Sequence, residues 1–389
     1  MRRLAGSLLC VVALGCAGRR TGADDGGVDA GATVDASLPP GSDGGAPGTD
    51  GGPAATDAGA DAGEPAGCAC PTLPATCLPP PPLTPAFTPE ATDVASQLFG
   101  VIACAETTLQ VAVYEATWGC IRDALQAALD RDADLALEVV VDDRECPVGS
   151  CFVDELTPAD RVTVRRDMRS GLMHHKFVIA DGVYLWVGSS NFTTRSFCTD
   201  HNNSVAIDDP VIVERYRGVF DRMFDLEDFG PVAPEGPTTS GPYTVYFSPE
   251  SPTSEPAGWM TAMVAAIGEA TTSVEAMIFA WTRTEISDAL VAAAARGVTV
   301  RALVTGTYAD DAPAQALLAA GIDVRVASIH SKVMILDGET VVTGSANWSE
   351  NAWSNNENSL WITDPGVAAA FGAQFESVYA AATAATPAP

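Results

Sequence analysis

The sequence predicts an α/β protein made of two similar halves, each with a largely parallel β-sheet covered by helices. Three observations lead to this fold class. The apolar fraction of 47% is that of a globular chain. Each half contains an apolar strand, an amphipathic helix and a second apolar strand. A segment holding a histidine and a lysine also occurs twice with the same spacing. The length of 389 residues leaves room for two domains of ordinary size.

The first segment, MRRLAGSLLCVVALGCAG, is typical of an export signal. Two arginines precede an apolar run from Leu8 to Leu14, which is too short to cross a bilayer as a mature helix. The ending ALGC resembles a bacterial lipobox, which implies cleavage before Cys16 and lipid attachment to its sulfur. A cleaved signal with an incidental cysteine is the alternative. We therefore expect a signal peptide at 1–16 and an exported protein of the bacterial cell envelope, lipid-anchored at the outer membrane or cell surface, or secreted.

Residues 17–87 are predicted to form a disordered tether. Most of this stretch consists of Gly, Ala, Asp and Pro, so it has too little apolar surface to offset the entropy of ordering. Its aspartates match neither an EF-hand loop nor a glycine-rich nonapeptide repeat, which favours solvation over calcium binding.

Eight cysteines remain once Cys10 of the signal and Cys16 are set aside. An even count in an exported protein suggests disulfides, and Cys146 and Cys151 in ECPVGSC are the most plausible local pair. All eight precede residue 200, so the second half must be stable without disulfides. They are Cys68, Cys70, Cys77, Cys104, Cys120, Cys146, Cys151 and Cys198.

The same order of elements is expected in a first domain at 88–235 and a second at 236–389. In the first, the strand TLQVAVYEA is followed by the helix IRDALQAALDRDAD and the strand LALEVVVDD. The second opens with the strand YTVYFS and continues with the strand TSVEAMIFAW, the helix TEISDALVAAAARG and the strand VTVRALVTG. Both runs have the βαβ pattern. The linker FGPVAPEGPTTSGP places the boundary near residue 235.

Each half then reaches one copy of the pattern H-x-K, four residues, D, six residues, G-S-x-N. Its two lysines are the only lysines of the chain, and every spacing agrees between the copies, so chance is not a serious explanation. The first copy comprises His174, Lys176, Asp181, Gly188, Ser189 and Asn191, and the second comprises His330, Lys332, Asp337, Gly344, Ser345 and Asn347.

The spacing places these side chains on one face of a hairpin. Residues i and i+2 of a strand share a face, so the histidine and lysine project to the same side. The Asp-Gly pair that follows is a hairpin turn signal. A two-residue turn there makes His174 face Ser189 and His330 face Ser345, with Asn191 on the face of Lys176. The glycine before each serine permits close backbone approach.

Such a face suits a phosphoryl group. Histidine exchanges protons near neutral pH, lysine supplies a compact charge, and serine and asparagine supply neutral hydrogen bonds. Two copies that face each other across a pseudo-twofold axis allow in-line displacement: one histidine attacks phosphorus and the other protonates the leaving alcohol. Water activated by the second histidine then breaks the phosphohistidine. Since the lysines supply the charge, we expect no metal and no cofactor.

The doubled motif HxK(x)4D(x)6GSxN resembles the phospholipase D superfamily, also called the HKD family. MHHKFVIADG and FSPE near residue 247 resemble its bacterial endonuclease-like and phospholipase-like members. The resemblance covers roughly residues 88–385. It implies two α/β/α sandwich halves related by a pseudo-twofold axis, with the active site at their interface and a phosphodiesterase mechanism through a phosphohistidine. It also implies that Asp181 and Asp337 mainly hold the motif's architecture.

Members of this family commonly place an acidic residue after GSxN, where it orients a catalytic histidine. In the second half NNENSLWI supplies Glu357, whereas HNNSVAI puts Asn202 at that place in the first half. A carboxylate partner stabilises imidazolium, and an amide leaves the ring easier to keep neutral. On this basis we expect His174 to be the nucleophile and His330 the general acid.

Other residues near the motifs have two interpretations each. Asp200 or Asp208 is a possible replacement for the missing carboxylate. His201 is expected in a loop rather than in catalysis, and His175 alternates away from the site and is expected in the core. The tryptophans near strand ends or motif asparagines either line a lipid-binding rim or leaving-group pocket, or pack in the core; they are Trp118, Trp281, Trp348 and Trp353.

Three functions are compatible with these residues. A phospholipase D-type enzyme acting on phospholipid at a membrane surface is favoured by the expected anchor. The formal net charge of −29 disfavours general capture of nucleic acid, which weakens the alternative of an endonuclease of the same fold. A non-catalytic lipoprotein that binds phosphate or lipid is the third hypothesis, and two intact motifs weaken it. Because one chain carries both motifs, a monomer is sufficient for the active site and no obligate protein partner is expected.

Overall fold

The computed structural model describes residues 68–89, 94–231, 236–250 and 257–387. The expected signal peptide, the lipid-attachment residue Cys16 and most of the expected tether lie outside these ranges. Within them, no helix combines the length and the apolar character needed to cross a bilayer.

The first half contains a seven-stranded sheet with the strand order β1-β7-β6-β5-β2-β3-β4. Only β2, β3 and β4 run parallel, whereas the other neighbours are antiparallel. The strands are β1 Pro85–Phe87, β2 Thr108–Val113, β3 Ala136–Val141, β4 Val162–Arg166, β5 Lys176–Ala180, β6 Tyr184–Gly188 and β7 Asn203–Ile207. The helices are α1 Val94–Ile102, α2 Gly119–Arg131, α3 Thr194–Cys198 and α4 Pro210–Asp225, with short 3-10 turns η1 Phe152–Asp154 and η2 Ala159–Arg161.

The second half contains a nine-stranded sheet with the order β16-β12-β11-β10-β13-β14-β15-β9-β8. Its strands β10, β11 and β12 are parallel, as their counterparts are in the first half. The strands are β8 Thr238–Ser240, β9 Tyr243–Ser248, β10 Ser273–Ile278, β11 Thr299–Thr305, β12 Asp323–Ala327, β13 Lys332–Leu336, β14 Thr340–Gly344, β15 Glu357–Thr363 and β16 Thr383–Ala384. The helices are α5 Gly258–Glu269, α6 Thr284–Ala295, α7 Ala312–Ala319, α8 Asn351–Ser354 and α9 Pro365–Ala381, with the 3-10 turn η3 Gly306–Tyr308.

The α/β class and the two similar halves are therefore confirmed, and the expectation of largely parallel sheets is corrected to mixed sheets. The βαβ runs do form parallel strands. Each motif, however, folds back on itself as an antiparallel hairpin, β5-β6 or β13-β14, which pairs with the βαβ unit through β2 or β10. A tight Asp-Gly turn can connect only antiparallel strands.

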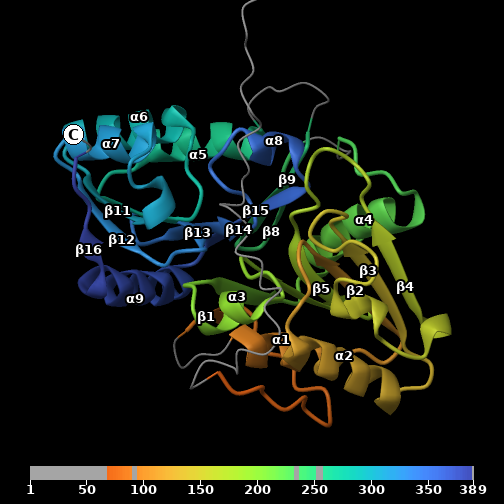
Figure 1. The fold of residues 1–389 in the computed structure, drawn as a ribbon. Helices are drawn as coiled ribbons and strands as arrows, with labels where there is room; N and C mark the ends of the chain where they lie inside the picture. Colours follow the sequence, from red (N-terminus) through yellow and green to blue (C-terminus); the bar gives the residue numbers. More distant parts are fainter. Residues whose placement is uncertain (1–67, 90–93, 232–235, 251–256, 388–389) are drawn as a thin grey trace, which may run out of the picture. The chain divides into compact units, whose positions relative to one another are not determined.

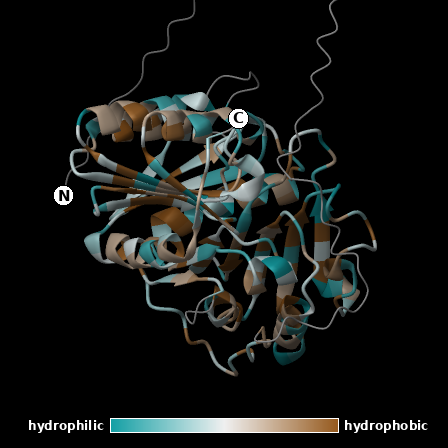
Figure 2. Ribbon diagram, turned by 60° about the vertical axis from the view of Figure 1, so that its left-hand side comes forward, coloured by the Kyte–Doolittle hydropathy of each residue, from teal (hydrophilic) through white to brown (hydrophobic). Residues whose placement is uncertain are grey.

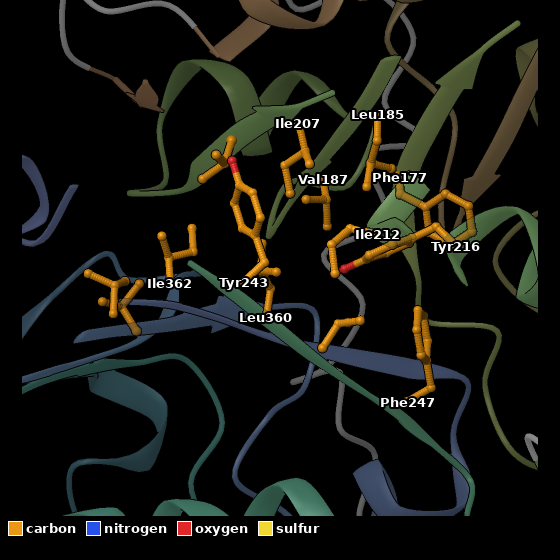
Figure 3. Close-up of a cluster of buried hydrophobic side chains, with 14 of the residues drawn as sticks. Phe177, Leu185, Val187, Ile207, Ile212, Tyr216, Tyr243, Phe247, Leu360 and Ile362 are labelled. Atoms are coloured by element: carbon orange, nitrogen blue, oxygen red, sulfur yellow. The ribbon is translucent and has the colours of Figure 1, made fainter. Parts of the chain in front are cut away.

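Helices cover the sheets, and a cluster of buried apolar side chains from both halves lies between them. In Figure 1, α5, α6 and α7 lie along one face of the second sheet and α9 along the other. Figure 2 shows hydrophobic residues along the strands in the interior of the protein. Figure 3 shows Phe177 of β5, Tyr216 of α4 and Phe247 of β9 meeting between the halves, with ring centroids 5.1 Å and 4.9 Å apart in succession. The halves are thus fixed against each other by a shared core.

Residues 68–87 belong to the folded first half and not to the tether, which corrects the tether's predicted end. Strand β1 pairs antiparallel with β7. Three disulfides, Cys68–Cys198, Cys70–Cys120 and Cys77–Cys104, tie this segment down. The ladder and the cross-links offset the entropy that a segment of such composition loses on ordering.

The local pair Cys146–Cys151 is confirmed, and all eight cysteines are bonded. The domain boundary near residue 235 falls among residues 232–235, which the structure does not describe, so it remains a prediction.

The Asp-Gly turns form as expected, but each hairpin contains one extra residue. Asp181 and Gly182 have φ of +51° and +65°, and the N–H of Val183 donates to the Ala180 carbonyl at 2.9 Å. The strands then pair Ala180 with Tyr184, so Val183 is a bulge. The second copy has the same shift, with Leu336 paired to Thr340. The predicted register, which placed His174 opposite Ser189 and His330 opposite Ser345, is therefore wrong by one residue.

The motif aspartates Asp181 and Asp337 hold the hairpins against the neighbouring strands. The Asp181 carboxylate accepts the N–H groups of the residues that lead into β2, at 2.8–2.9 Å, and Asp337 accepts those that lead into β10, at 2.8–3.1 Å. Asp181 lies five residues beyond Lys176 along an extended strand, a distance of about 16 Å. These contacts agree with the architectural role that the family resemblance implies.

We predict that Asp337→Asn lowers the free energy of unfolding by about 1–3 kcal/mol, because hydrogen bonds to a charged acceptor are lost. Burial alone would raise the pKa of Asp337, but the N–H groups of Thr272, Thr271 and Ser273 lower it below its usual value. The charged form therefore contributes stability above about pH 4, and this contribution is lost as the pH falls through the lower pKa of the folded state.

Denaturant unfolding at several pH values checks this prediction, with Glu339→Gln in the same turn as the control. The deficit of Asp337→Asn should shrink in acid. A deficit that stays constant down to pH values well below 4 would contradict the assigned role.

Candidate active site

Both motif histidines lie just before the first strand of their hairpin, at the interface of the halves. The backbone N–H of His174 donates to the Asn356 carbonyl at 3.1 Å, and that of His330 donates to the His201 carbonyl at 3.0 Å. Each histidine is therefore held by the chain of the opposite half. His174 is 5% exposed and His330 8% exposed, so a substrate phosphate would meet them in a largely dry environment.

The side-chain partners of the histidines also come from the opposite half. His174 Nδ1 lies 2.8 Å from the Glu357 carboxylate, and His330 Nδ1 lies 2.9 Å from Asn202 Oδ1. The expectation that Glu357 serves the histidine of its own half is wrong, because β7 and β15 begin beside the opposite motif. Isolated β-bridges at Met173 with Asn356 and at His201 with Ile329 fix this crossing.

The two aspartates proposed to replace the missing carboxylate do not do so. Asp200 pairs with Arg195 at 3.0 Å and accepts a hydrogen bond from Ser328, and Asp208 is exposed. Asn202 itself occupies the position beside His330. One histidine therefore has a carboxylate partner and the other an amide partner, as expected. The carboxylate, however, contacts His174 and the amide contacts His330, which is the reverse of the expectation.

The hydrogen-bond network determines which nitrogen of His330 carries the proton. Asn202 Nδ2 donates to the Ser196 carbonyl at 2.9 Å, and its Oδ1 accepts from Ser189 Oγ at 2.7 Å. The amide oxygen therefore faces His330 and can only accept, so His330 Nδ1 must carry a hydrogen. His174 takes the same tautomer when Glu357 is ionised, because a carboxylate can only accept a hydrogen bond. In both neutral rings the lone pair then lies on Nε2, the nitrogen left for chemistry.

Each lysine packs beside its histidine on an aromatic ring that the sequence analysis did not single out. Lys176 Nζ donates to the His174 carbonyl at 2.7 Å and lies 5.1 Å from the centre of the Tyr114 ring. Lys332 Nζ donates to the His330 carbonyl at 2.6 Å and lies 5.2 Å from the centre of the Phe279 ring.

Tyr114 and Phe279 also touch the histidines, with ring centroids 4.9 Å from His174 and 4.8 Å from His330. Each is the first residue after the strand that leads into its helix, β2 or β10. Aligning the two halves beyond the HxK motif would have revealed this shared aromatic position.

The motif serines bond the residues that hold the histidines, Ser189 to Asn202 and Ser345 to Glu357, and they also connect strands. Ser189 Oγ accepts the N–H of Asn203 at 3.1 Å, and Ser345 Oγ accepts the N–H of Asn358 at 3.0 Å. The glycine before each serine allows this approach. A Cβ at Gly188 would stand 2.4 Å from the carbonyl oxygen of Asn203.

The motif asparagines carry buried polar atoms without hydrogen-bond partners. These atoms are Asn191 Oδ1 and both amide atoms of Asn347. Buried amides are normally satisfied, so unpaired ones at a site indicate groups kept for a ligand. An amide N–H beside two ammonium groups suits a phosphate oxygen.

Burial sets the protonation of the site. It lowers the pKa of both His174 and His330 well below the usual value, and the charges of the two lysines lower them further. Burial raises the pKa of Glu357 to about 8, although the charges of Lys176 and Lys332 oppose this rise. Near neutral pH both imidazoles are therefore neutral before substrate binds, and Glu357 holds a proton.

The remaining candidates are structural. His175 is fully buried and its Nδ1 lies 3.2 Å from Asn358 Nδ2, which confirms its place in the core. His201 lies in a loop, with Nδ1 3.3 Å from the Thr88 carbonyl oxygen. Packing, and not a lipid-binding rim, accounts for the four tryptophans, which are all buried: Trp118, Trp281, Trp348 and Trp353.

Comparisons with known proteins agree with this geometry. A family model described as "Cardiolipin synthase, PLD-like domain" matches residues 98–224 and 263–379, more than half of the chain. The mitochondrial cardiolipin hydrolase of Xenopus tropicalis is 31% identical over 140 residues, which cover 36% of this chain and 65% of the relative. The protein of that name from Chlamydomonas reinhardtii is 32% identical over 131 residues, covering 34% and 57%. The chain thus spans less than two thirds of the length of these relatives.

Two solved structures share the fold. The phosphatidylserine synthase of Haemophilus influenzae Rd KW20 superposes with a TM-score of 0.59 at 12% identity, over 77% of this chain and 87% of that one. The polyphosphate kinase of Porphyromonas gingivalis gives a TM-score of 0.52 at 14% identity, over 75% of this chain and 49% of that one. At these identities the likeness concerns the fold alone.

We predict that Asn202→Asp raises the pKa of His330 by about 1 or more, because a carboxylate replaces the amide at Nδ1 and stabilises imidazolium. NMR titration of the imidazole signals measures this. The chain has four histidines, so His201 serves as the internal reference. If the pKa of His174 rises in place of that of His330, the crossed pairing is incorrect.

Proposed function

The chain belongs to the family of phospholipase D-like domains and carries two copies of that domain, and we propose that it is a phosphodiesterase that hydrolyses phospholipid head-group phosphodiester bonds through a phosphohistidine. One observation carries the proposal. Two buried HxK motifs of a single chain meet with each histidine held at Nδ1 by the opposite half, at 2.8 Å and 2.9 Å. That leaves two Nε2 atoms for the two ends of an in-line displacement.

We assign His174 as the nucleophile, as the sequence suggested, but for the opposite reason: its partner is the carboxylate and not the amide. When Nε2 forms a bond to phosphorus, the ring becomes cationic while Nδ1 keeps its hydrogen. Glu357, 2.8 Å from Nδ1 and fully buried, stabilises that cation once its carboxyl group is ionised, and the developing positive charge of the ring favours this ionisation. His330 has only the neutral Asn202 amide, so its imidazolium gives up a proton more readily and suits the general acid.

The two steps conserve atoms and charge. The negative charge of the bound phosphodiester first favours protonation of His330 at Nε2. In the first step, the His174 Nε2 lone pair then forms the N–P bond, the P–O ester bond breaks, and the leaving alkoxide takes that proton from His330 Nε2. In the second, neutral His330 takes a proton from water while the water oxygen attacks phosphorus. The N–P bond then breaks and its electron pair returns to His174.

The lysines and asparagines would neutralise the phosphoryl group in both steps. Lys176 and Lys332 are 0% and 2% exposed, so their charges act in a medium of low dielectric, where they count for more than in water. Asn347, with both amide atoms unpaired, supplies a donor that a phosphate oxygen can use.

Phospholipid is the proposed substrate, with cardiolipin as the first compound to test. The relatives named cardiolipin hydrolase and the description of the matching family both support this choice. The net charge of −29 opposes long-range attraction of nucleic acid. Both motifs meet within one chain, which supports a monomeric active site.

We further propose that the protein is exported to the bacterial cell envelope and anchored through Cys16. The four disulfides of the first half support an oxidising compartment. The apolar run before Cys16 and the ALGC ending support the anchor.

Hydrolysis of cardiolipin or phosphatidylcholine vesicles, compared with cleavage of single-stranded DNA, tests the substrate. We expect release of phosphatidic acid or head group, lowered at least about a thousandfold by His174→Asn and by His330→Asn. His201→Asn keeps the backbone carbonyl that accepts from His330 and changes a side chain beside the Thr88 carbonyl, so it should retain activity within a few-fold. Cleavage of DNA with intact vesicles would reject the phospholipid assignment, and turnover of neither would favour a binding protein.

A trapping experiment tests the nucleophile. With a phosphodiester whose leaving group needs no acid, such as a p-nitrophenyl ester, His330→Ala should release nitrophenol in one burst and then stall. Mass spectrometry should find phosphate on His174, because water then lacks its base. His174→Ala should give no burst. Phosphate on His330 in that variant would reverse the assignment.

A further inference from the structure

Three aspartates outside the phosphodiesterase site converge at one edge of the first sheet. Asp142 and Asp143 follow the last residue of β3, and Asp167 follows the last residue of β4. The two strands are parallel neighbours with Val141 paired to Arg166, so their ends meet. One carboxylate oxygen from each aspartate lies within 4.8 Å of the others.

This cluster is buried and forms no salt bridge with the part of the chain that the structure describes, although Arg169 and Lys176 are near enough for their charges to act on Asp167 and Asp142. Asp142 is 1% exposed, Asp167 is 5% exposed and Asp143 is half-buried. In the described ranges, none of the three forms an ion pair with a lysine or arginine. The neighbouring Arg144 and Arg169 direct hydrogen bonds to backbone carbonyls instead.

Two of the carboxylate oxygens accept no hydrogen bond from an N–H or O–H group of the described residues. Asp142 accepts the N–H groups of the two residues after Asp143 through one oxygen and that of Met173 through the other. Asp167 Oδ1 accepts the N–H of Asp143 at 3.0 Å. Asp167 Oδ2 and Asp143 Oδ1, however, are buried and unpaired. Buried charges are normally paired or bound to a metal, so this arrangement requires a neutralising group.

We propose that Asp142, Asp143 and Asp167 bind one Ca²⁺ ion. Carboxylate oxygens are the ligands that Ca²⁺ prefers, at 2.3–2.6 Å, so ligands on opposite sides of the ion stand about 5 Å apart. The three oxygens therefore fit around one ion, with water completing its shell. Neither strand end alone has the spacing of a known calcium loop, and the fold brings the two together.

The ion would support the active site without taking part in its chemistry. Asp142 accepts the N–H of Met173 at 3.1 Å, and Met173 directly precedes His174. Ca²⁺ at this edge would tie the ends of β3 and β4 to the segment that leads to the nucleophile. The site is independent of the proposed phosphodiesterase function, since ion binding and unfolding are measured without substrate.

A shared proton is the competing way to neutralise the cluster. Burial raises the pKa of Asp167 to about 7, and the charge of Asp142 adds to this rise. A protonated Asp167 could donate to a neighbouring carboxylate. Measurement at about pH 8, above this pKa, separates the two states.

Isothermal titration of the purified chain with CaCl₂, together with thermal unfolding, tests the proposal. We expect one Ca²⁺ per chain and a higher Tm in its presence. Asp167→Asn and Asp143→Asn should each weaken binding about tenfold or more. Asp310→Asn, which removes an exposed aspartate from the second half, should leave the affinity within about twofold.

The absence of both heat and a Tm change in the wild-type chain would overturn the proposal. Equal binding by wild type and both variants would also overturn it, by placing the ion elsewhere. Circular dichroism confirms that each variant is folded. Since Asp143 is half-buried, Asp143→Asn serves as the test if Asp167→Asn does not fold.

Discussion

The crossed hydrogen bonds between the halves are the interaction on which the site depends. His174 is held by Glu357, the first residue of β15, and His330 by Asn202, the residue just before β7, so each partner comes from the other half. Neither half alone can orient its own histidine or fix its tautomer. The shared apolar core around Phe177, which Figure 3 shows between the sheets, keeps these partners in place. Packing between the halves and the chemistry of the site are therefore parts of one arrangement.

Burial determines what these groups can do. A fully buried imidazole with an ammonium group beside it loses its proton easily, so both rings start neutral. The same burial holds a proton near Glu357 and strengthens the field of the lysines at the place where a phosphoryl group would lie. One partner is a carboxylate and the other an amide, so a nearly symmetric frame presents two histidines with different proton affinities. This difference gives each ring its own role in a two-step displacement.

The residues that hold the two hairpins are equivalent in the two halves, whereas the partners of the two catalytic histidines differ. Asp181 and Asp337 hold equivalent hairpins, Gly188 and Gly344 allow equivalent strand contacts, and Tyr114 corresponds to Phe279 beneath the lysines. The halves differ in what surrounds this framework. Among the described residues, the four disulfides lie in the first half, and so does the aspartate cluster at the ends of β3 and β4. The two halves thus share one geometric unit and differ in the residues around it.

The sequence by itself determined the α/β class, the two halves, the βαβ elements and the motif residues, because periodicity and turn signals act over a few residues. It also identified Glu357 and Asn202 as the place where the halves differ. Only the tertiary structure decided which histidine each of them contacts, since the contacting residues are 183 and 128 positions apart and meet only when the two sheets pack together. The one-residue bulge at Val183 and the meeting of Asp142 with Asp167 were hidden for the same reason. Strand register and strand neighbours are set by packing across the sheet, which local spacing does not encode.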